Sequence, residues 1–432
     1  MSSTSFQVVG NSVSVAFVVF TGTIGAHTQT SQARDQIRAD QLAVGRQIMS
    51  HSAMRAEGAG QAPVKKKTPS QRKELSTRAA RLAFIRKAQI WAPTNVSQMD
   101  LRAGPEGAGS FQPNETVTCH YTQTTLPGTS PKFDCDVGNG DVVKVRYGAR
   151  NGKVEAAVIA SRVLWALGFG ADRLYPVVVR CRGCSPDPWT QRAPAVGEQV
   201  FDPAVIERKP KGHEMKSENK GGWAWPELEL VDEQQGGAPR AQRDALKLLA
   251  VFMQHTDNKP LNERLLCLSK GRADGDACDQ PFMMMHDVGL TFGHANLRNR
   301  NTTGSLNFEE WSNTPIWRDP VACVAHMSKS FSGTLGNPTI SEAGRQFLAG
   351  LLVQLTDQQL HDLFEVARVE RRSRDPHHAG LRPATVDEWV TAFQRKRDEI
   401  VNISASRDAV ARLLPSAASP TSRRRGRLSR RT

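Results

Sequence analysis

His255-Thr256-Asp257-Asn258-Lys259-Pro260-Leu261-Asn262 and Met285-His286-Asp287-Val288-Gly289 are the two stretches that decide the fold of this chain. The first follows residues 240–253, whose apolar side chains recur at helical spacing. Between the two stretches, apolar runs at 265–268 and 282–285 flank a polar loop and predict a hairpin. A predicted helix therefore leads into the first stretch, and a predicted hairpin carries the chain to the second.

The elements predicted around these stretches are β-rich before them and helical after them. Alternating or β-branched residues predict four strands, at 117–121, 132–137, 141–147 and 175–180. Asn151 and Gly168 bound a predicted helix between the third and fourth strands. Helical patterns dominate from residue 341 to 402. This order predicts an α+β protein with a small β-rich lobe containing one helix, followed by a larger helical lobe.

The two stretches resemble motifs of the protein-kinase-like superfamily. His255 to Asn262 matches the pattern H-x-D-x-K-P-x-N of the protein-kinase catalytic loop. Met285 to Gly289 resembles the metal-binding D-F-G, and also the H-x-D-x-G strand end of phosphatidylinositol kinases and atypical HipA-like kinases. The resemblance covers roughly residues 115–400. It implies a two-lobed protein-kinase-like fold, a bacterial atypical kinase, and Mg²⁺-dependent phosphoryl transfer from ATP bound between the lobes.

The resemblance assigns roles to the residues of the two stretches. Asp257 would orient the acceptor hydroxyl and take its proton, and Lys259 would neutralise charge on the transferred group. His255 would brace the loop. Asn262 and Asp287 would hold Mg²⁺, which prefers oxygen ligands.

The nucleotide-binding residues are expected in the β-rich part. Lys144, on the third strand, would reach the α- and β-phosphates, and Glu155, in the following helix, would hold Lys144 by an ion pair. Gly128, Thr129 and Ser130, between the first two strands, would cover the phosphates with backbone N–H groups and hydroxyls.

Three departures from the protein-kinase pattern leave the acceptor open. No G-x-G-x-x-G precedes Lys144, no A-P-E follows Asp287, and the gap from Asn262 to Asp287 is long. The acceptor could be a protein, a lipid, a sugar or another small molecule. The alternative is a catalytically inactive kinase-like binding or scaffold protein. Specific nucleic-acid binding is a third reading without a supporting motif.

The predicted organisation has five parts: a possible signal or frayed apolar segment (1–26), a basic linker with a helix (27–110), a nucleotide-binding N-lobe (111–235), a C-lobe with the catalytic loop, metal site and helices (236–405), and a disordered Arg-rich tail (406–432). The formal net charge is +14, and six arginines lie among the last ten residues. The tail is either a solvated segment or a tether to an anionic surface.

Cysteine spacing bears on the cellular compartment. Six of the seven cysteines form sequence-local pairs, leaving Cys323: Cys119 with Cys135, Cys181 with Cys184, and Cys267 with Cys278. Such pairs are typical of an oxidising compartment. They favour an exported or periplasmic protein over the cytoplasmic alternative, although ATP is plentiful only in the cytosol.

Overall fold

A computed structural model describes residues 73–75, 78–124, 126–128, 130–149, 151–190, 197–210, 212–217, 222–268, 278–293, 306–328, 333–371 and 383–403. All of them belong to one of the two units into which the chain divides, Gly60–Thr432. The predicted segment 1–26, the predicted tail 406–432 and Thr129 lie outside the described residues.

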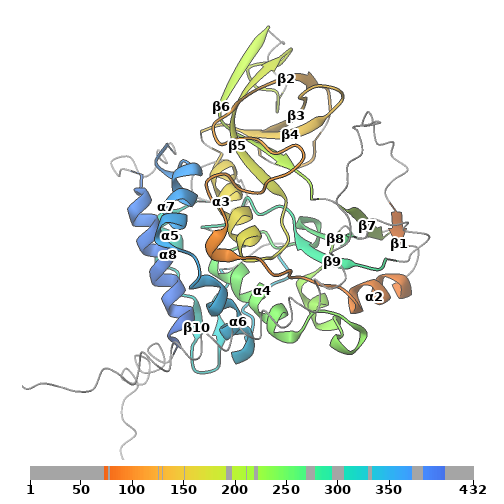
Figure 1. Cartoon of the computed structure of the whole chain (residues 1–432), viewed down its shortest axis with the longest axis vertical. Coiled ribbons are helices and arrows are strands. Elements are labelled where there is room, and N and C mark those ends of the chain that lie inside the picture. The colour runs from red at the N-terminus through yellow and green to blue at the C-terminus, as the bar shows by residue number, and fades with distance from the viewer. Residues whose placement is uncertain are drawn as a thin grey trace, which may run out of the picture. The chain divides into compact units, whose positions relative to one another are not determined.

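Five strands form a closed barrel, which Figure 1 shows grouped together above helix α3. They are β2 (Thr116–Thr122), β3 (Lys132–Asp136), β4 (Val142–Tyr147), β5 (Arg173–Arg182) and β6 (Glu198–Arg208). The order around the barrel is β2-β3-β4-β6-β5, with β2 and β5 parallel and the other pairs antiparallel. The four predicted strands are therefore present. The fifth, β6, lies in a stretch that the sequence patterns left unassigned, and it completes the ring.

The alternation of the barrel strands separates an apolar interior from a charged outer face. Val143, Val145 and Tyr147 of β4 belong to the barrel core with residues of the other strands. Because successive side chains point to opposite faces of a strand, Lys144 and Arg146 lie on the outer face. Two disulfides contribute to the same core, Cys119–Cys135 and Cys181–Cys184.

A second sheet carries the two stretches that the sequence singles out. It contains β1 (Lys73–Leu75), β7 (His213–Ser217), β8 (Glu263–Cys267) and β9 (Pro281–Met285), in the order β1-β7-β8-β9. The predicted hairpin is confirmed as β8 and β9, whose register pairs Glu263 with Met285. Its far end is closed by the predicted disulfide Cys267–Cys278.

The chain before the barrel is built into this second sheet. Helix α2 (Arg78–Arg86) places Arg81 so that its Nη2 atom is 2.6 Å from Oε2 of Glu227. Downstream, the Gln89 N–H donates to Pro281 O at 2.8 Å, and the Met283 N–H donates to Gln89 O at 2.8 Å. Residues 78–91 therefore supply backbone partners to β9.

Helices form the remainder of the core. They are α3 (Lys153–Ala166), α4 (Arg240–Phe252), α5 (Phe308–Asn313), α6 (Glu342–Leu352), α7 (Asp357–Val366) and α8 (Val386–Val401), with a small hairpin of β10 (Trp317–Asp319) and β11 (Val324–Ala325). In Figure 1, α3 lies between the barrel and the other helices. The predicted mixture of strands and helices is confirmed. None of the described helices has the length and apolarity to span a membrane.

Helix α8 contains a buried lysine that makes stability depend on pH. Lys396 is fully buried, donates to Thr314 O and lies 5.3 Å from the Trp311 ring centroid. Burial lowers the pKa of Lys396 to about 8. The unfolded chain therefore binds more protons between pH 8 and 10.5, and stability rises with pH across that window.

We expect the variant Lys396→Met to lack this pH-dependent component. The free energy of unfolding of the variant minus that of the wild type should fall by about 2 kcal/mol between pH 7 and pH 9.5. Urea denaturation at both pH values measures the difference, in which other titrating groups cancel. The exposed Lys87, changed to Met, is the control. An equal pH dependence in wild type and Lys396→Met would contradict the prediction.

Candidate active site

The catalytic-loop stretch begins where α4 ends, and its first residue is a buried brace. His255 has no exposed surface, and its Nε2 atom is 3.3 Å from Oε1 of Glu263. The same Glu263 oxygen accepts a 3.2 Å hydrogen bond from Nε1 of Trp225. His255 thus contacts Glu263 from a fully buried position at the start of the loop.

Asp257 and Asn262 are held in one turn of the loop. Nζ of Lys259 lies 2.9 and 3.0 Å from the two carboxylate oxygens of Asp257. Nδ2 of Asn262 donates to the backbone carbonyl of Asp257 at 2.6 Å. This bond fixes the amide orientation, so Oδ1 of Asn262 is the atom that remains for a cation.

Backbone hydrogen bonds join the loop to Asp287. The Asn262 carbonyl accepts from the N–H of His286 at 2.9 Å and from the N–H of Asp287 at 3.1 Å. The β8–β9 ladder continues this pairing away from the site. Asn262 and Asp287, which are 25 positions apart in the numbering, therefore lie side by side.

Two cationic side chains, one from β4 and one from the start of α3, contact Asp287. Arg146 Nη1 is 3.1 Å from its Oδ1, and Lys153 Nζ is 3.6 Å from its Oδ2. Burial by itself would raise the pKa of this carboxyl. The positive charges of Arg146 and Lys153 outweigh burial and hold the pKa of Asp287 well below its usual range. Asp287 is therefore ionised, as a metal ligand must be.

The predicted ion pair between Lys144 and Glu155 is wrong. Lys144 instead binds Glu207 of β6, which stands directly opposite it in the β4–β6 register. Glu207 is buried and also accepts from Nε of Arg146 at 3.0 Å. Glu155 is buried in α3 and acts electrostatically on Arg368, which follows α7. The barrel thus supplies the partner of Lys144 from a neighbouring strand, because strand pairing brings Glu207 closer than the helix brings Glu155.

The predicted phosphate-covering loop connects β2 to β3. Gly128 has φ of +108°, and a Cβ there would meet Nζ of Lys132 at 2.7 Å. Ser130 is buried. A substitution at Gly128 would be strained and would press on Lys132, so this glycine has a steric reason to be present.

A second group of charged side chains surrounds His286, the residue before Asp287. Nδ1 of His286 is bonded to Asp172, and Nε2 of His286 lies 2.7 Å from Nη2 of Arg264. Arg264 also forms an ion pair with Glu214, with Nη1 of Arg264 3.2 Å from Oε2 of Glu214. Ligand-type atoms of Asp172, Glu207 and His286 also lie within 4.8 Å of one another. Glu207 is bonded to Lys144 and Arg146, and His286 to Asp172 and Arg264, so these side chains form an ion-pair network around the residue preceding Asp287.

The oxygen donors near Asp287 fit a magnesium ion. The carboxylate of Asp287 and Oδ1 of Asn262 are hard ligands of the kind that Mg²⁺ takes together with phosphate oxygens and water. Asp287 is already ionised, and it belongs to the same backbone-bonded unit as Asn262. The donor set therefore suits Mg²⁺ and contains no sulfur or imidazole ligand that would favour a softer metal.

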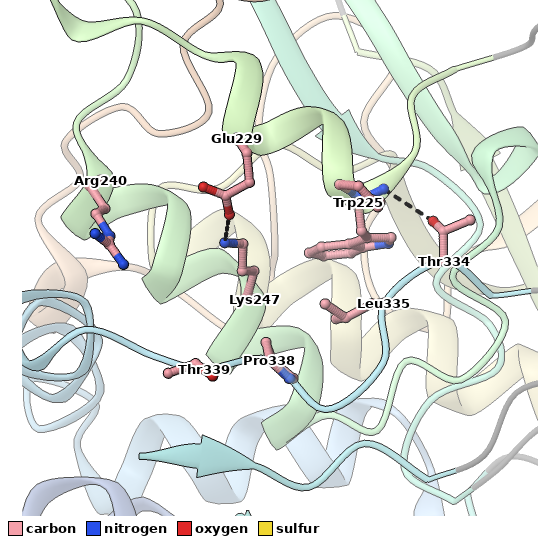
Figure 2. Close-up of a pocket in the computed structure, with 9 residues that line it drawn as sticks. Trp225, Glu229, Arg240, Lys247, Thr334, Leu335, Pro338 and Thr339 are labelled. Carbon is pink, nitrogen blue, oxygen red and sulfur yellow. Dashed lines mark hydrogen bonds and ion pairs between the residues drawn. The ribbon is translucent and has the colours of Figure 1, made fainter. Parts of the chain in front are cut away.

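A separate pocket of about 370 Å³ adjoins the catalytic loop (Figure 2). Trp225, Leu335 and Pro338 form an apolar part, while Arg240, Lys247 and Glu229 form a charged part. Its wall is bonded to the loop, because the Leu335 N–H donates to Oδ1 of Asn258 at 2.7 Å. None of the predicted site residues lines this pocket.

Several residues of the site were not predicted from the sequence. Arg146 follows Lys144 by two positions, and that period-2 spacing placed it on the same strand face. Lys132 and Lys153 belong to none of the motifs recognised in the sequence. Glu207 lies in the stretch between 185 and 240 that the patterns could not place, so no local signal linked it to Lys144.

Comparisons with known proteins give only weak likenesses. No protein-family model matches the sequence, and no curated protein matches it. Among solved structures, the Helicobacter pylori proinflammatory kinase CtkA is 10% identical, with a TM-score of 0.38 over 70% of this chain and 100% of that one. A Golgi casein kinase solved with Mn/ADP is 12% identical, with a TM-score of 0.30 over 69% and 75% of the two chains. Likenesses at this level say nothing about the activity of this chain.

Proposed function

We propose that this chain is an Mg²⁺-dependent phosphotransferase of the two-lobed protein-kinase-like type that uses ATP as donor. One observation carries the proposal: the Asn262 carbonyl binds the N–H groups of both His286 and Asp287, at 2.9 and 3.1 Å. This contact brings an Asp-bearing loop and a carboxylate flanked by cations into one site. Phosphoryl transfer needs this combination, because catalysis depends on positioning and charge neutralisation.

Each residue has a defined task in the proposed reaction. Asp257 accepts a hydrogen bond from the acceptor hydroxyl and takes its proton, and Lys259 turns from Asp257 toward the transferred group. Asp287 and Asn262 hold Mg²⁺, which when bound neutralises phosphate charge and orients the donor. Lys144, kept in place by Glu207, binds donor phosphates. His255 keeps the loop rigid through Glu263.

A catalytically inactive binding or scaffold protein is the second candidate. The observation that favours it is that both acidic residues already have cationic partners: Lys259 on Asp257, and Arg146 with Lys153 on Asp287. An inactive protein could keep these pairs permanently. A phosphotransferase must exchange them for substrate and metal.

The acceptor and the compartment belong to the proposal as well. The acceptor remains a protein, a lipid or a small molecule, and membership of the HipA-like branch is part of the same hypothesis. The three disulfides favour an exported protein. The Arg-rich tail would add attraction to an anionic surface.

Ligand-induced stabilisation combined with radiolabel transfer separates the two candidates. We expect ATP with Mg²⁺ to raise the melting temperature of the full chain, since a ligand that binds only the folded state stabilises it. ATP with a chelator should raise it less. Labelled γ-phosphate should then appear on the protein itself or on an added acceptor. Stabilisation without transfer supports the inactive candidate. If no nucleotide stabilises the chain, the proposed phosphotransferase is refuted and a scaffold that binds no nucleotide remains.

A further inference from the structure

Two like charges face each other on the outer side of the barrel. Lys132 of β3 is the register partner of Arg146 of β4. The neighbouring interior residues Phe133 and Val145 belong to the barrel core, so alternation places Lys132 and Arg146 together on the outer face. Like charges directly opposite each other on a sheet are destabilising. Arg146 is compensated by Glu207 and Asp287, so Lys132 is the member of this pair that needs an anion.

Lys132 has no such anion among the described residues. Its Nζ atom makes no hydrogen bond or ion pair with them and lies 5.2 Å from the ring centroid of Trp189. Partial burial, followed by the positive charge of Arg146, lowers the pKa of Lys132 to about 8. The negative charge of Asp287 raises the pKa of Lys132, so the Lys132 ammonium interacts electrostatically with the proposed metal ligand.

The charge balance of the surrounding groups points the same way. The described cations that face this region are Lys132, Lys144, Arg146, Lys153, Lys209 and Arg264. The described carboxylates are Asp172, Glu207, Glu214 and Asp287. His286 lies between the two sets, with Nδ1 bonded to Asp172 and Nε2 2.7 Å from Nη2 of Arg264. Six side-chain cations thus face four carboxylates, which leaves an excess of positive charge among these described groups.

We infer that Lys132 binds the terminal phosphate of the donor and makes the site select triphosphates over diphosphates. This inference rests on the proposed function and adds to it a residue and a specificity. Lys144 and Arg146 are held by Glu207, and Lys153 lies against Asp287. Among the described residues, Lys132 and Lys209 are the cations of this group with no ion-pair partner, and of these two Lys132 is the one that interacts electrostatically with Asp287. A magnesium-bound triphosphate carries a net charge of about −2 and the diphosphate about −1, so the triphosphate compensates more of the excess positive charge. A side chain at Gly128 would crowd the ammonium, because a Cβ there would lie 2.7 Å from Nζ of Lys132.

Calorimetric binding tests the selectivity. The ligands are a non-hydrolysable ATP analogue, ADP and inorganic tripolyphosphate, each with Mg²⁺. Changing Lys132 to Gln should weaken the binding of the ATP analogue and of tripolyphosphate by about tenfold or more, and the binding of ADP by much less. Lys132→Arg should retain most of the binding. The control is Arg180→Gln. It removes an exposed charge on β5 that is bonded to Glu198 of β6 in the same barrel, and it should bind all three ligands as the wild type does.

Trp189 provides a second readout that does not depend on catalysis. A phosphate bound to Lys132 changes the charge 5.2 Å from the Trp189 ring, so the wild-type emission should change on adding tripolyphosphate. Trp189→Phe should remove that change. This measurement needs no variant at Lys132 and stays decisive if Lys132→Gln does not fold.

The outcomes separate this inference from the proposed function. Binding of the ATP analogue with unchanged selectivity in Lys132→Gln, or an equal loss for ATP analogue and ADP, overturns the inference alone. Selective tripolyphosphate binding without any phosphate transfer supports the inference and counts against the proposed activity. Absence of binding by wild type to any of the three ligands overturns both.

Discussion

Replacing Asp287 or Asp257 by Asn is expected to lower phosphate transfer from ATP by about a thousandfold or more. Loss of a metal ligand or of the residue that positions the acceptor removes several kcal/mol of transition-state stabilisation. Asp287→Asn should also weaken Mg²⁺-dependent nucleotide binding, because it removes an ionised ligand. Asp257→Asn should leave nucleotide binding nearly unchanged, because Asp257 is paired with Lys259 on the acceptor side.

Rates with labelled ATP and calorimetric binding measure the two effects separately. Asp141→Asn is the matched control, since this exposed carboxylate bonds only to Arg208 on the barrel surface among the described residues. Thermal unfolding of each variant establishes that it is folded. Transfer at the wild-type rate by both site variants would refute the proposed mechanism.

The second large effect is expected at Glu207. Glu207→Gln leaves Lys144 and Arg146 without their shared carboxylate in a buried position, and should lower the free energy of unfolding by about 3 kcal/mol. It should also weaken ATP binding, because Lys144 is no longer held. Glu155→Gln should affect ATP binding much less, since Glu155 acts on Arg368 instead.

Urea denaturation measures the stability of both variants, and calorimetry measures their ATP binding. Both measurements are made below the melting temperature of the less stable variant. A double variant of Glu207→Gln with Lys144→Met should recover part of the lost stability, because it removes the cation that loses its carboxylate partner, whereas Arg146 keeps Asp287. If Glu155→Gln reduces ATP affinity more than Glu207→Gln does, the assignment of the Lys144 partner is wrong.

The parts of the site that could be predicted are those encoded by local sequence. The hairpin of β8 and β9 follows from two apolar runs and a cysteine pair, and its register brings Asn262 to Asp287 without long-range information. The pairings of Cys119 with Cys135 and Cys181 with Cys184 are likewise local and are confirmed.

The parts that could not be predicted depend on contacts between distant segments. Glu207 meets Lys144 only because β6 pairs with β4 and closes the barrel, and strand partners 63 residues apart leave no periodic signal. The helix-borne Glu155 was the nearer choice in sequence and was wrong. Lys132 and Lys153 could be assigned to the site only from the folded structure, in which the outer barrel face and the start of α3 lie near Asp287.

The attachment of residues 78–91 to β9 sets a lower limit on the piece of this chain that can fold by itself. Arg81 donates to the Gly222 carbonyl at 2.9 Å, and a Cβ on Gly222 would lie 2.1 Å from Pro260 O in the catalytic loop. Gln89 exchanges backbone hydrogen bonds with the strand that ends at Met285. A fragment cut to begin at the barrel would therefore expose one edge of β9 and loosen the support of Asn262. We therefore expect the smallest piece of this chain that folds by itself to begin upstream of α2.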